Sequence, residues 1–174
     1  MPNHVQSTLK FKGKNKEVEE ILEFIKKNEK RKFSFEKIIP IPPHILRGNL
    51  GAKEIEICGK DNWYDWCCSN WGTKWDAFGV VVEIKKTSNS VNFITEKDKA
   101  VAKIFFSTAW SSVEIVIATL SKIFPKITFE YAFKEETESF LGKVTFKGGK
   151  QIRYSENKQT VWKSLRNQYE NIYV

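Results

Sequence analysis

The stretch that decides the fold runs from Val101 to Phe133 and reads VAKIFFSTAWSSVEIVIATLSKIFPKITFEYAF. Its first part, Val101 to Ala109, is apolar and rich in strand-forming residues, as a buried central strand would be. A second set of apolar residues recurs at the spacing of one helix face, and Pro125 ends it. The helix residues are Val113, Val116, Ile117, Leu120 and Phe124; the alternating residues of a second strand follow at Ile127, Phe129, Tyr131 and Phe133. The stretch therefore predicts a strand, a helix and a strand in succession.

The residues before this stretch repeat its order. Val5 to Phe11 alternates apolar and polar side chains and predicts a strand from the start of the chain. Val18, Ile21, Leu22 and Ile25 fall at helical spacing, so Lys16 to about Asn28 is expected to form an amphipathic helix. At the later helix, Ser111 and Glu114 have the spacing of a capping box.

An insertion at about 33–79 separates the first helix from the next strand. Phe33 to Ile39 is expected to be extended, the prolines of IPIPPHIL favour a loop, and Gly48 to Gly59 is expected to be irregular. Val80 to Lys86 then predicts a strand, with Val91 to Ile94 pairing back as a small hairpin.

The end of the chain adds a hairpin and a helix to this pattern. Val144 and Phe146 precede Gly148-Gly149, and Ile152 and Tyr154 follow, which is typical of a hairpin with a two-glycine turn. Apolar residues at helical spacing predict a last helix over Asn157 to about Asn171. The whole order indicates a single α+β domain over 1–174. It comprises a ferredoxin-like plait over 1–134, an antiparallel sheet with two helices on one face, and an extension over 135–174.

Four of the six tryptophans lie in DNWYDWCCSNWGTKWDAFG, residues 61–79. Trp63, Trp66 and Cys67 have helical spacing, Asp61 or Asn62 is suited to cap that helix, and Asn70 to Thr73 breaks it. For Trp63 and Trp66 the spacing favours a place in the core. For Trp71, Lys74 and Trp75, core packing and a binding site remain equal alternatives, because a lysine between two indoles can hold an anion or stack on a ring.

Composition and net charge indicate which classes of partner and site are expected. The chain has 174 residues, 41% of them hydrophobic, and a net charge of +8, which favours anionic partners. Its basic clusters, at 26–32 and 143–166, are more typical of a solvated surface than of a nucleic-acid interface. Three cysteines without C-x-x-C spacing argue against a disulfide framework and a zinc site. No signal peptide or membrane span is visible, so a cytoplasmic protein is expected.

Catalysis is weakly supported. His4 as a general base and Cys67 as a nucleophile have no partner at a defined spacing. Asp61, Asp65 and Asp76 are too scattered for a metal site, and no glycine-rich phosphate loop is present. No metal or cofactor is therefore expected, and a binding protein is favoured over an enzyme, with an uncharacterised enzyme as an alternative.

Three segments resemble one family. MPNH at 1–4, NWGTKWDAF at 70–78 and STAWS at 107–111 are similar to the YubB-type ferredoxin-like family of bacteria, plasmids and phages. Ser112-Val113 stands where that family would lead us to expect prolines. The resemblance implies the plait and a mobile-element or bacterial protein. It supplies no activity, cofactor or catalytic residue.

In a plait, the chain start, the entry to the second strand and the exit of the third strand can meet at one end of the sheet. We therefore expect one shallow ligand site, with indoles for stacking and a lysine and a helix N-terminus for an anion. Its residues are Asn3, His4, Trp71, Lys74, Trp75, Trp110 and Ser111. The predicted ligand is a protein or a small anion such as a nucleotide, as for a host-defence antagonist. The alternative is single-stranded nucleic acid on the sheet face, aided by FKGGKQIRY at 146–154.

Overall fold

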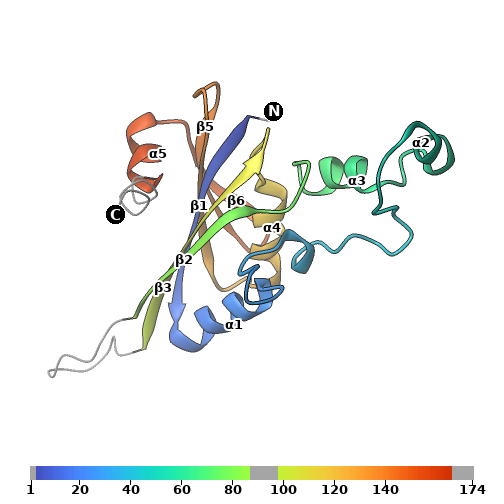
Figure 1. Ribbon diagram of the computed structural model, residues 1–174. Helices are drawn as coiled ribbons and strands as arrows, with labels where there is room; N and C mark the ends of the chain where they lie inside the picture. Colours follow the sequence, from blue (N-terminus) through green and yellow to red (C-terminus); the bar gives the residue numbers. More distant parts are fainter. Residues whose placement is uncertain (1–2, 87–97, 166–174) are drawn as a thin grey trace, which may run out of the picture.

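The computed structural model describes residues 3–86 and 98–165 (Figure 1). The elements follow one another as β1 (His4–Lys14), α1 (Asn15–Ile25), η1 (Phe35–Lys37), α2 (Ala52–Cys58), α3 (Trp63–Asn70), β2 (Phe78–Lys86), β3 (Lys99–Ala109), α4 (Glu114–Ile123), β4 (Thr128–Glu135), β5 (Leu141–Lys147), β6 (Lys150–Ser155) and α5 (Lys158–Leu165). None of the helices in the described part of the chain is long and apolar enough to cross a membrane.

The sheet has six strands in the order β2-β3-β1-β4-β5-β6, and every neighbouring pair is antiparallel. The central strand β1 pairs along its whole length with β3, from His4 opposite Ala109 to Lys14 opposite Lys99. The first four strands and α1 and α4 form the βαββαβ unit of a ferredoxin-like plait. The predicted α+β fold is confirmed, with β5, β6 and α5 added beyond β4.

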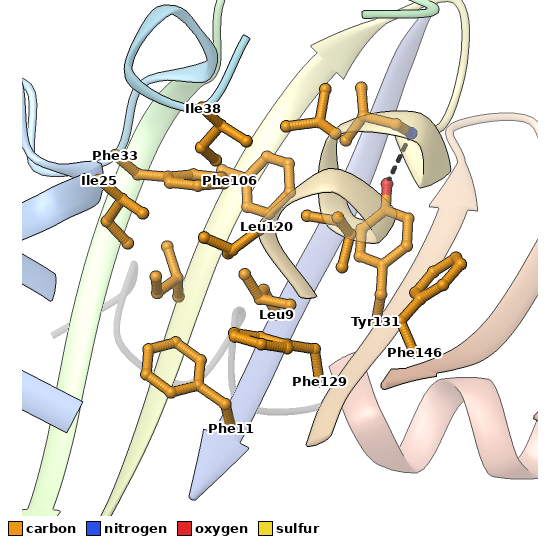
Figure 2. Packing of buried hydrophobic residues seen from close by; sticks show 14 of the residues in the cluster. Leu9, Phe11, Ile25, Phe33, Ile38, Phe106, Leu120, Phe129, Tyr131 and Phe146 are labelled. Atoms are coloured by element: carbon orange, nitrogen blue, oxygen red, sulfur yellow. Dashed lines mark hydrogen bonds between the residues drawn. The ribbon is translucent and has the colours of Figure 1, made fainter. Parts of the chain in front are cut away.

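The main core lies between the sheet and helices α1 and α4 (Figure 2). The alternation in β1 sends Leu9 and Phe11 to this face, as the period of a strand requires. Tyr131 is fully buried there, yet its hydroxyl is satisfied. The Val113 N–H donates to it at 3.1 Å, and Ser7 Oγ lies 3.0 Å away. One polar group thus ties β4 to β1 and to the start of α4.

Helix α5 covers part of the opposite face of the sheet (Figure 1). Val161 and Leu165 pack on Ala132 and Leu141, which alternate with the core-facing residues of β4 and β5. The predicted start of this helix is confirmed, and the expected continuation beyond residue 165 lies outside the described residues. The β5–β6 hairpin is also as predicted, with Gly148 and Gly149 at φ 58° and 80° in its turn.

Three local predictions are wrong. The first concerns 33–39, where Phe35–Lys37 forms a 3-10 helix because a distant carboxylate caps it, as described below. Next, 48–59 contains the helix α2, although no residue of α2 is buried and Ile57 is 87% exposed. Finally, Ser111 does not cap α4: the cap position is Val113, without a side-chain cap hydrogen bond. The small hairpin expected at 91–94 lies outside the described residues.

Candidate functional site

The tryptophan segment connects α3 to β2 beside the end of β3. Asn62 caps α3, as predicted, by accepting a hydrogen bond from the Asp65 N–H at 3.0 Å. The helix ends at Asn70, and Gly72, at φ 77°, turns the chain. Between this turn and β2, Thr73 and Asp76 bond to other parts of the fold, and the two residues between them, Lys74 and Trp75, are partly exposed.

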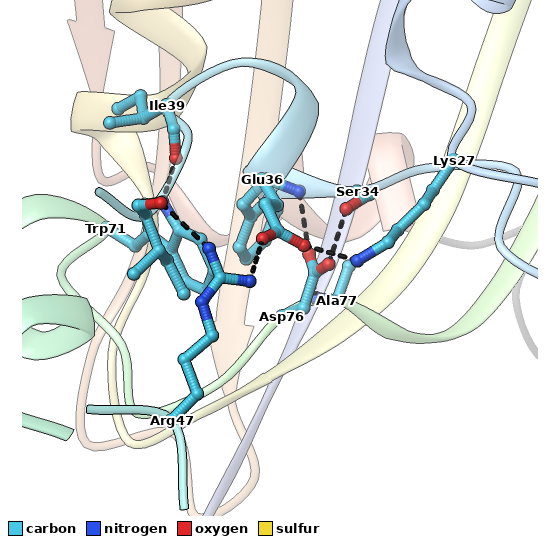
Figure 3. A network of polar contacts seen from close by, with 10 residues as sticks. Lys27, Ser34, Glu36, Ile39, Arg47, Trp71, Asp76 and Ala77 are labelled. Carbon is cyan, nitrogen blue, oxygen red and sulfur yellow. Dashed lines mark hydrogen bonds and ion pairs between the residues drawn. The ribbon is translucent and has the colours of Figure 1, made fainter. Parts of the chain in front are cut away.

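Trp71, one of the predicted site residues, packs in the core. It is 3% exposed, and its ring packs edge-on against Phe35 and Trp66 with centroids 5.8 and 5.6 Å away. Its indole N–H donates to the Ile39 carbonyl at 2.9 Å (Figure 3). This bond holds the proline-containing loop onto the plait. It also uses the one side-chain donor of the tryptophan, which is thereby satisfied.

Asp76 fastens the insertion from the other side (Figure 3). Its carboxylate accepts hydrogen bonds from Ser34 Oγ at 2.6 Å and from the Phe35 N–H at 2.7 Å, at the start of η1. Nearby, Glu36 pairs with Lys27 and, at 2.6 Å, with Arg47. Hydrogen bonds from Lys27, the larger effect, and from Arg47 hold the pKa of Glu36 below its usual value despite partial burial. These contacts hold in place the loops that connect α2 and α3 to the plait.

Thr73 joins the segment to β3. Its hydroxyl donates to the Ala109 carbonyl at 2.7 Å and accepts from the Ala109 N–H at 3.2 Å. Trp110 also bonds across the sheet, from its N–H to the Asn3 carbonyl at 2.9 Å. As a result, Lys74, which follows Thr73, and Trp110, which follows Ala109, lie side by side.

The Lys74 ammonium lies among three aromatic rings. Its Nζ is 4.9 Å from the ring centroid of Trp75, 5.2 Å from that of Trp110 and 5.8 Å from that of Tyr64. Each distance is within the range at which a cation is attracted to a ring face. We call Tyr64, Lys74, Trp75 and Trp110 the Lys74 surface. No ion pair between described residues involves Lys74, so among them its charge contacts ring faces and no carboxylate.

Trp110 is the most exposed ring of this surface, with 40% of its area accessible. It has φ 68°, in the left-handed region that few residues other than glycine adopt. This conformation turns the chain sharply between β3 and α4, and the Tyr64 ring meets the indole edge-on with centroids 6.4 Å apart. Within the described residues, neither the Trp110 nor the Trp75 indole N–H has an acceptor.

The remaining predicted site residues lie at the border or contribute only backbone. Asn3 supplies the carbonyl bonded to Trp110. His4 packs edge-on against Phe78 at 5.1 Å, and Phe78 in turn lies 6.5 Å from Trp75, so His4 is two rings away from Lys74.

Ser111 is held by its backbone, because its carbonyl accepts from Thr108 Oγ1 at 2.7 Å. The helix N-terminus expected to bind an anion is occupied as well. The Val113 N–H donates to Tyr131, and the Glu114 carboxylate lies in the first turn, 2.5 Å from Ser112 Oγ.

Sequence reasoning missed Tyr64. It lies in the first turn of α3 directly after Trp63. The indole N–H of Trp63 donates to the Gly48 carbonyl at 3.1 Å. The only signal was the aromatic density of WYDW, which does not show which ring faces outward.

The cysteine thiols are poorly suited to nucleophilic chemistry. Cys67 is buried, which is the main reason that its thiol pKa rises to about 12, and burial likewise raises the pKa of Cys68. Thiols with raised pKa values are poor nucleophiles at neutral pH. Within 3–86 and 98–165, no group of three histidine, cysteine, aspartate or glutamate side chains could hold a metal ion.

A comparison with a protein-family model supports the fold. A family model described as the ferredoxin-like domain in Api92-like protein matches residues 91–174, just under half of the chain. The match supports the ferredoxin-like domain that the resemblance implied, under the Api92-like description and not the YubB name. It begins after the tryptophan segment and contains Trp110 alone of the Lys74 surface.

A solved structure, the crystal structure of protein Api92 from Yersinia pseudotuberculosis, is similar with a TM-score of 0.45 and 14% identity. The similarity covers 68% of this chain and 38% of that one, so this chain spans well under half of the Api92 protein's length. The search of curated proteins found no match.

Proposed function

We propose that the protein is a non-catalytic binding protein whose Lys74 surface holds a ligand that combines a negative charge with a flat ring, as a nucleotide does. The observation that carries this proposal is the position of the half-buried Lys74 ammonium among three rings, without a carboxylate partner in the described residues.

The charge of Lys74 supports the anionic part of the ligand. A surface lysine is usually free in water, but this one is held in place by ring contacts and by the anchors on either side of it. Because its side chain is already ordered, an anion that binds it loses less conformational entropy than it would with a mobile lysine.

The indoles support the ring part of the ligand. Trp110 exposes 40% of its surface at an end of the sheet, and base–indole stacking contributes about 1–3 kcal/mol. The N–H groups of Trp75 and Trp110, which lack acceptors among the described residues, can each donate to a ligand oxygen. A phosphate attached to a base would use all of these features together.

A mobile-element context and antagonism of host defence belong to the proposal through the sequence resemblance only, and no residue of the surface bears on either. Single-stranded nucleic acid has the same chemistry as a nucleotide and is the second candidate. The exposed Trp110 and the basic, exposed strand β6, with Arg153 and Tyr154, favour it.

The test is a titration of tryptophan fluorescence with AMP, ADP and cyclic AMP, and of the anisotropy of a labelled short oligothymidylate, at low and moderate salt. The variants are Lys74→Met, which keeps the length of the side chain without its charge, and Lys74→Arg, which keeps the cation over the rings. Lys85→Met, at an exposed lysine on β2, is the matched control. We expect Lys74→Met to weaken nucleotide binding by about tenfold, the value of one charge-assisted hydrogen bond.

The salt dependence distinguishes the two ligands. A strand that neutralises several phosphates loses affinity steeply as salt rises, whereas one nucleotide does so only slightly. Quenching by nucleotides that survives moderate salt and is lost in Lys74→Met supports the proposal. The same affinity in Lys74→Met and Lys85→Met would rule out the Lys74 surface, and no response to any probe would shift the case to a protein partner.

A further inference from the structure

A second basic site lies on the other face of the sheet, away from the Lys74 surface. There, strands β1, β3, β4 and β5 and helix α5 enclose a cavity of about 460 Å³, a volume typical of sites for small molecules. Among the described residues, four lysines line it, and the one acidic side chain in its lining is that of Glu130. The lysines are Lys10, Lys103, Lys143 and Lys163.

Glu130 neutralises only part of this charge. Its carboxylate lies 2.9 Å from Lys143 Nζ and 3.6 Å from Lys10 Nζ. Burial opposes its ionisation, but the bond to Lys143 and the charges of both lysines hold its pKa below the usual value. Lys103 and Lys163 form no ion pair with a described residue, so the cavity has a clear excess of positive charge.

The strand register places two of these lysines opposite each other. Lys10 on β1 is the cross-strand partner of Lys103 on β3, and like charges in that position destabilise a sheet. Glu83 is the neighbour of Lys103 on β2, yet no ion pair joins the two side chains. The repulsion between Lys10 and Lys103 would be relieved by an anion lying between them.

Thr8 gives an independent indication of a ligand. It lines the cavity, is 3% exposed, and its Oγ1 is buried without a hydrogen-bond partner among the described residues. Buried hydroxyls are nearly always bonded, because an unpaired one has lost its water without replacement. A ligand oxygen in the cavity would supply the missing partner.

We propose that this cavity binds a compact phosphate-bearing anion of the diphosphate type. The lysines supply the charge, and the Thr8 hydroxyl supplies a donor that has no partner among the described residues. The hydroxyls of Thr160 and Ser164 also line the cavity but already donate to the Asn157 side chain and the Thr160 carbonyl. No aromatic side chain of residues 3–86 or 98–165 lines the cavity, so these residues offer no platform for a base. This distinguishes its ligand from an extended nucleic-acid strand, which would need stacking.

Isothermal titration calorimetry of the full chain with inorganic pyrophosphate tests the proposal, with inorganic sulfate as a weaker anion for comparison. The variants are Lys103→Met and Thr8→Val, and the matched control is Lys12→Met, on the same face of β1 but outside the cavity. We expect each cavity variant to weaken pyrophosphate binding, Lys103→Met by about tenfold, and the control to bind as the wild type does.

Thermal melts of the unliganded variants make the test independent of misfolding. Removing an unpaired hydroxyl or one of two facing lysines should leave the melting temperature unchanged or raise it, while pyrophosphate binding is weakened. A lower melting temperature in Thr8→Val, or pyrophosphate affinity equal in Lys103→Met and Lys12→Met, would overturn the proposal. So would wild-type protein that does not bind pyrophosphate more tightly than sulfate. Lys74→Met should leave this binding intact, which separates the two sites.

Discussion

The hydroxyl of Thr73 takes the place of a neighbouring strand for Ala109, accepting its N–H at 3.2 Å and donating to its carbonyl at 2.7 Å. Ala109 is the last residue of β3, and the partner strand β2 pairs with β3 only up to Ser107, through Phe78. One side chain thus completes the edge of the sheet and sets the spacing between Lys74 and Trp110.

Thr73→Val should destabilise the protein by about 1–3 kcal/mol, because valine keeps the shape but leaves the Ala109 N–H buried and unpaired. Urea unfolding at neutral pH measures this. Thr119→Val is the control, since that hydroxyl bonds only to a carbonyl of its own helix, and a change of a few tenths of a kcal/mol is expected there. Equal effects of the two variants would show that the Thr73 bonds contribute nothing special.

Tyr131→Phe should also destabilise the protein by about 1–3 kcal/mol, because it leaves a buried N–H without an acceptor at the start of α4. The variant removes the acceptor for the Val113 N–H, which is buried in the core, and one contact of Ser7 Oγ. Tyr154→Phe is the control, because that hydroxyl bonds to Glu156 on the surface. Denaturant midpoints compare the two, and similar losses would contradict the importance of the buried hydroxyl.

Glu135 should make stability depend on acid pH. Hydrogen bonds from Thr137, then from Ser139, lower its pKa to about 2, against about 4.3 in an unfolded chain. A carboxyl whose pKa is lower in the folded protein stabilises it above the unfolded value, and this stabilisation is lost as pH falls through the folded value. The wild type should therefore be more stable than Glu135→Gln at neutral pH, with a difference that shrinks between about pH 4.3 and pH 2.

Urea unfolding at a series of pH values follows that difference. Glu20→Gln, at an exposed position of α1, should show no such convergence with the wild type. A constant difference between the wild type and Glu135→Gln down to the lowest pH would show that the ionised carboxylate is not the stabilising group.

Cys67 should resist alkylation in the native protein. It is 2% exposed with a pKa of about 12, so almost no thiolate is present at mildly alkaline pH. Brief treatment with iodoacetamide and peptide mass spectrometry should find Cys58, on the exposed helix α2, modified first, and Cys67 modified only in denaturant. Modification of Cys67 at the rate of Cys58 would mean that α3 opens readily from the core.

The plait could be predicted from sequence because its elements carry their own periodicity. Leu9 and Phe11 show a period of two, and Val116, Ile117 and Leu120 show that of a helix, so the core face is written locally. The insertion is different. The 3-10 helix at Phe35 depends on Asp76, far along the chain, and no local pattern reveals such a partner.

The candidate site could be predicted only in part for a similar reason. WGTKW marked the right segment, but spacing alone does not separate Trp71, which lies in the core, from Trp75, which lies beside the lysine. Tyr64 and Trp110 meet there only because α3 folds back beside the end of β3. The lysine cavity could not be predicted without the strand register, which places Lys10 on β1 opposite Lys103 on the neighbouring strand β3.

The backbone conformation at Trp110 is unfavourable for any residue that has a side chain. A side chain at φ 68° costs about 1–2 kcal/mol compared with glycine, so random drift under selection for folding alone would replace this tryptophan with glycine or asparagine. Under the proposed function, relatives that bind the same ligand should keep an aromatic residue here in spite of that cost. Under the same proposal, relatives that have lost the ligand should lose this aromatic residue before the buried Trp71, so the position would mark inheritance of the function.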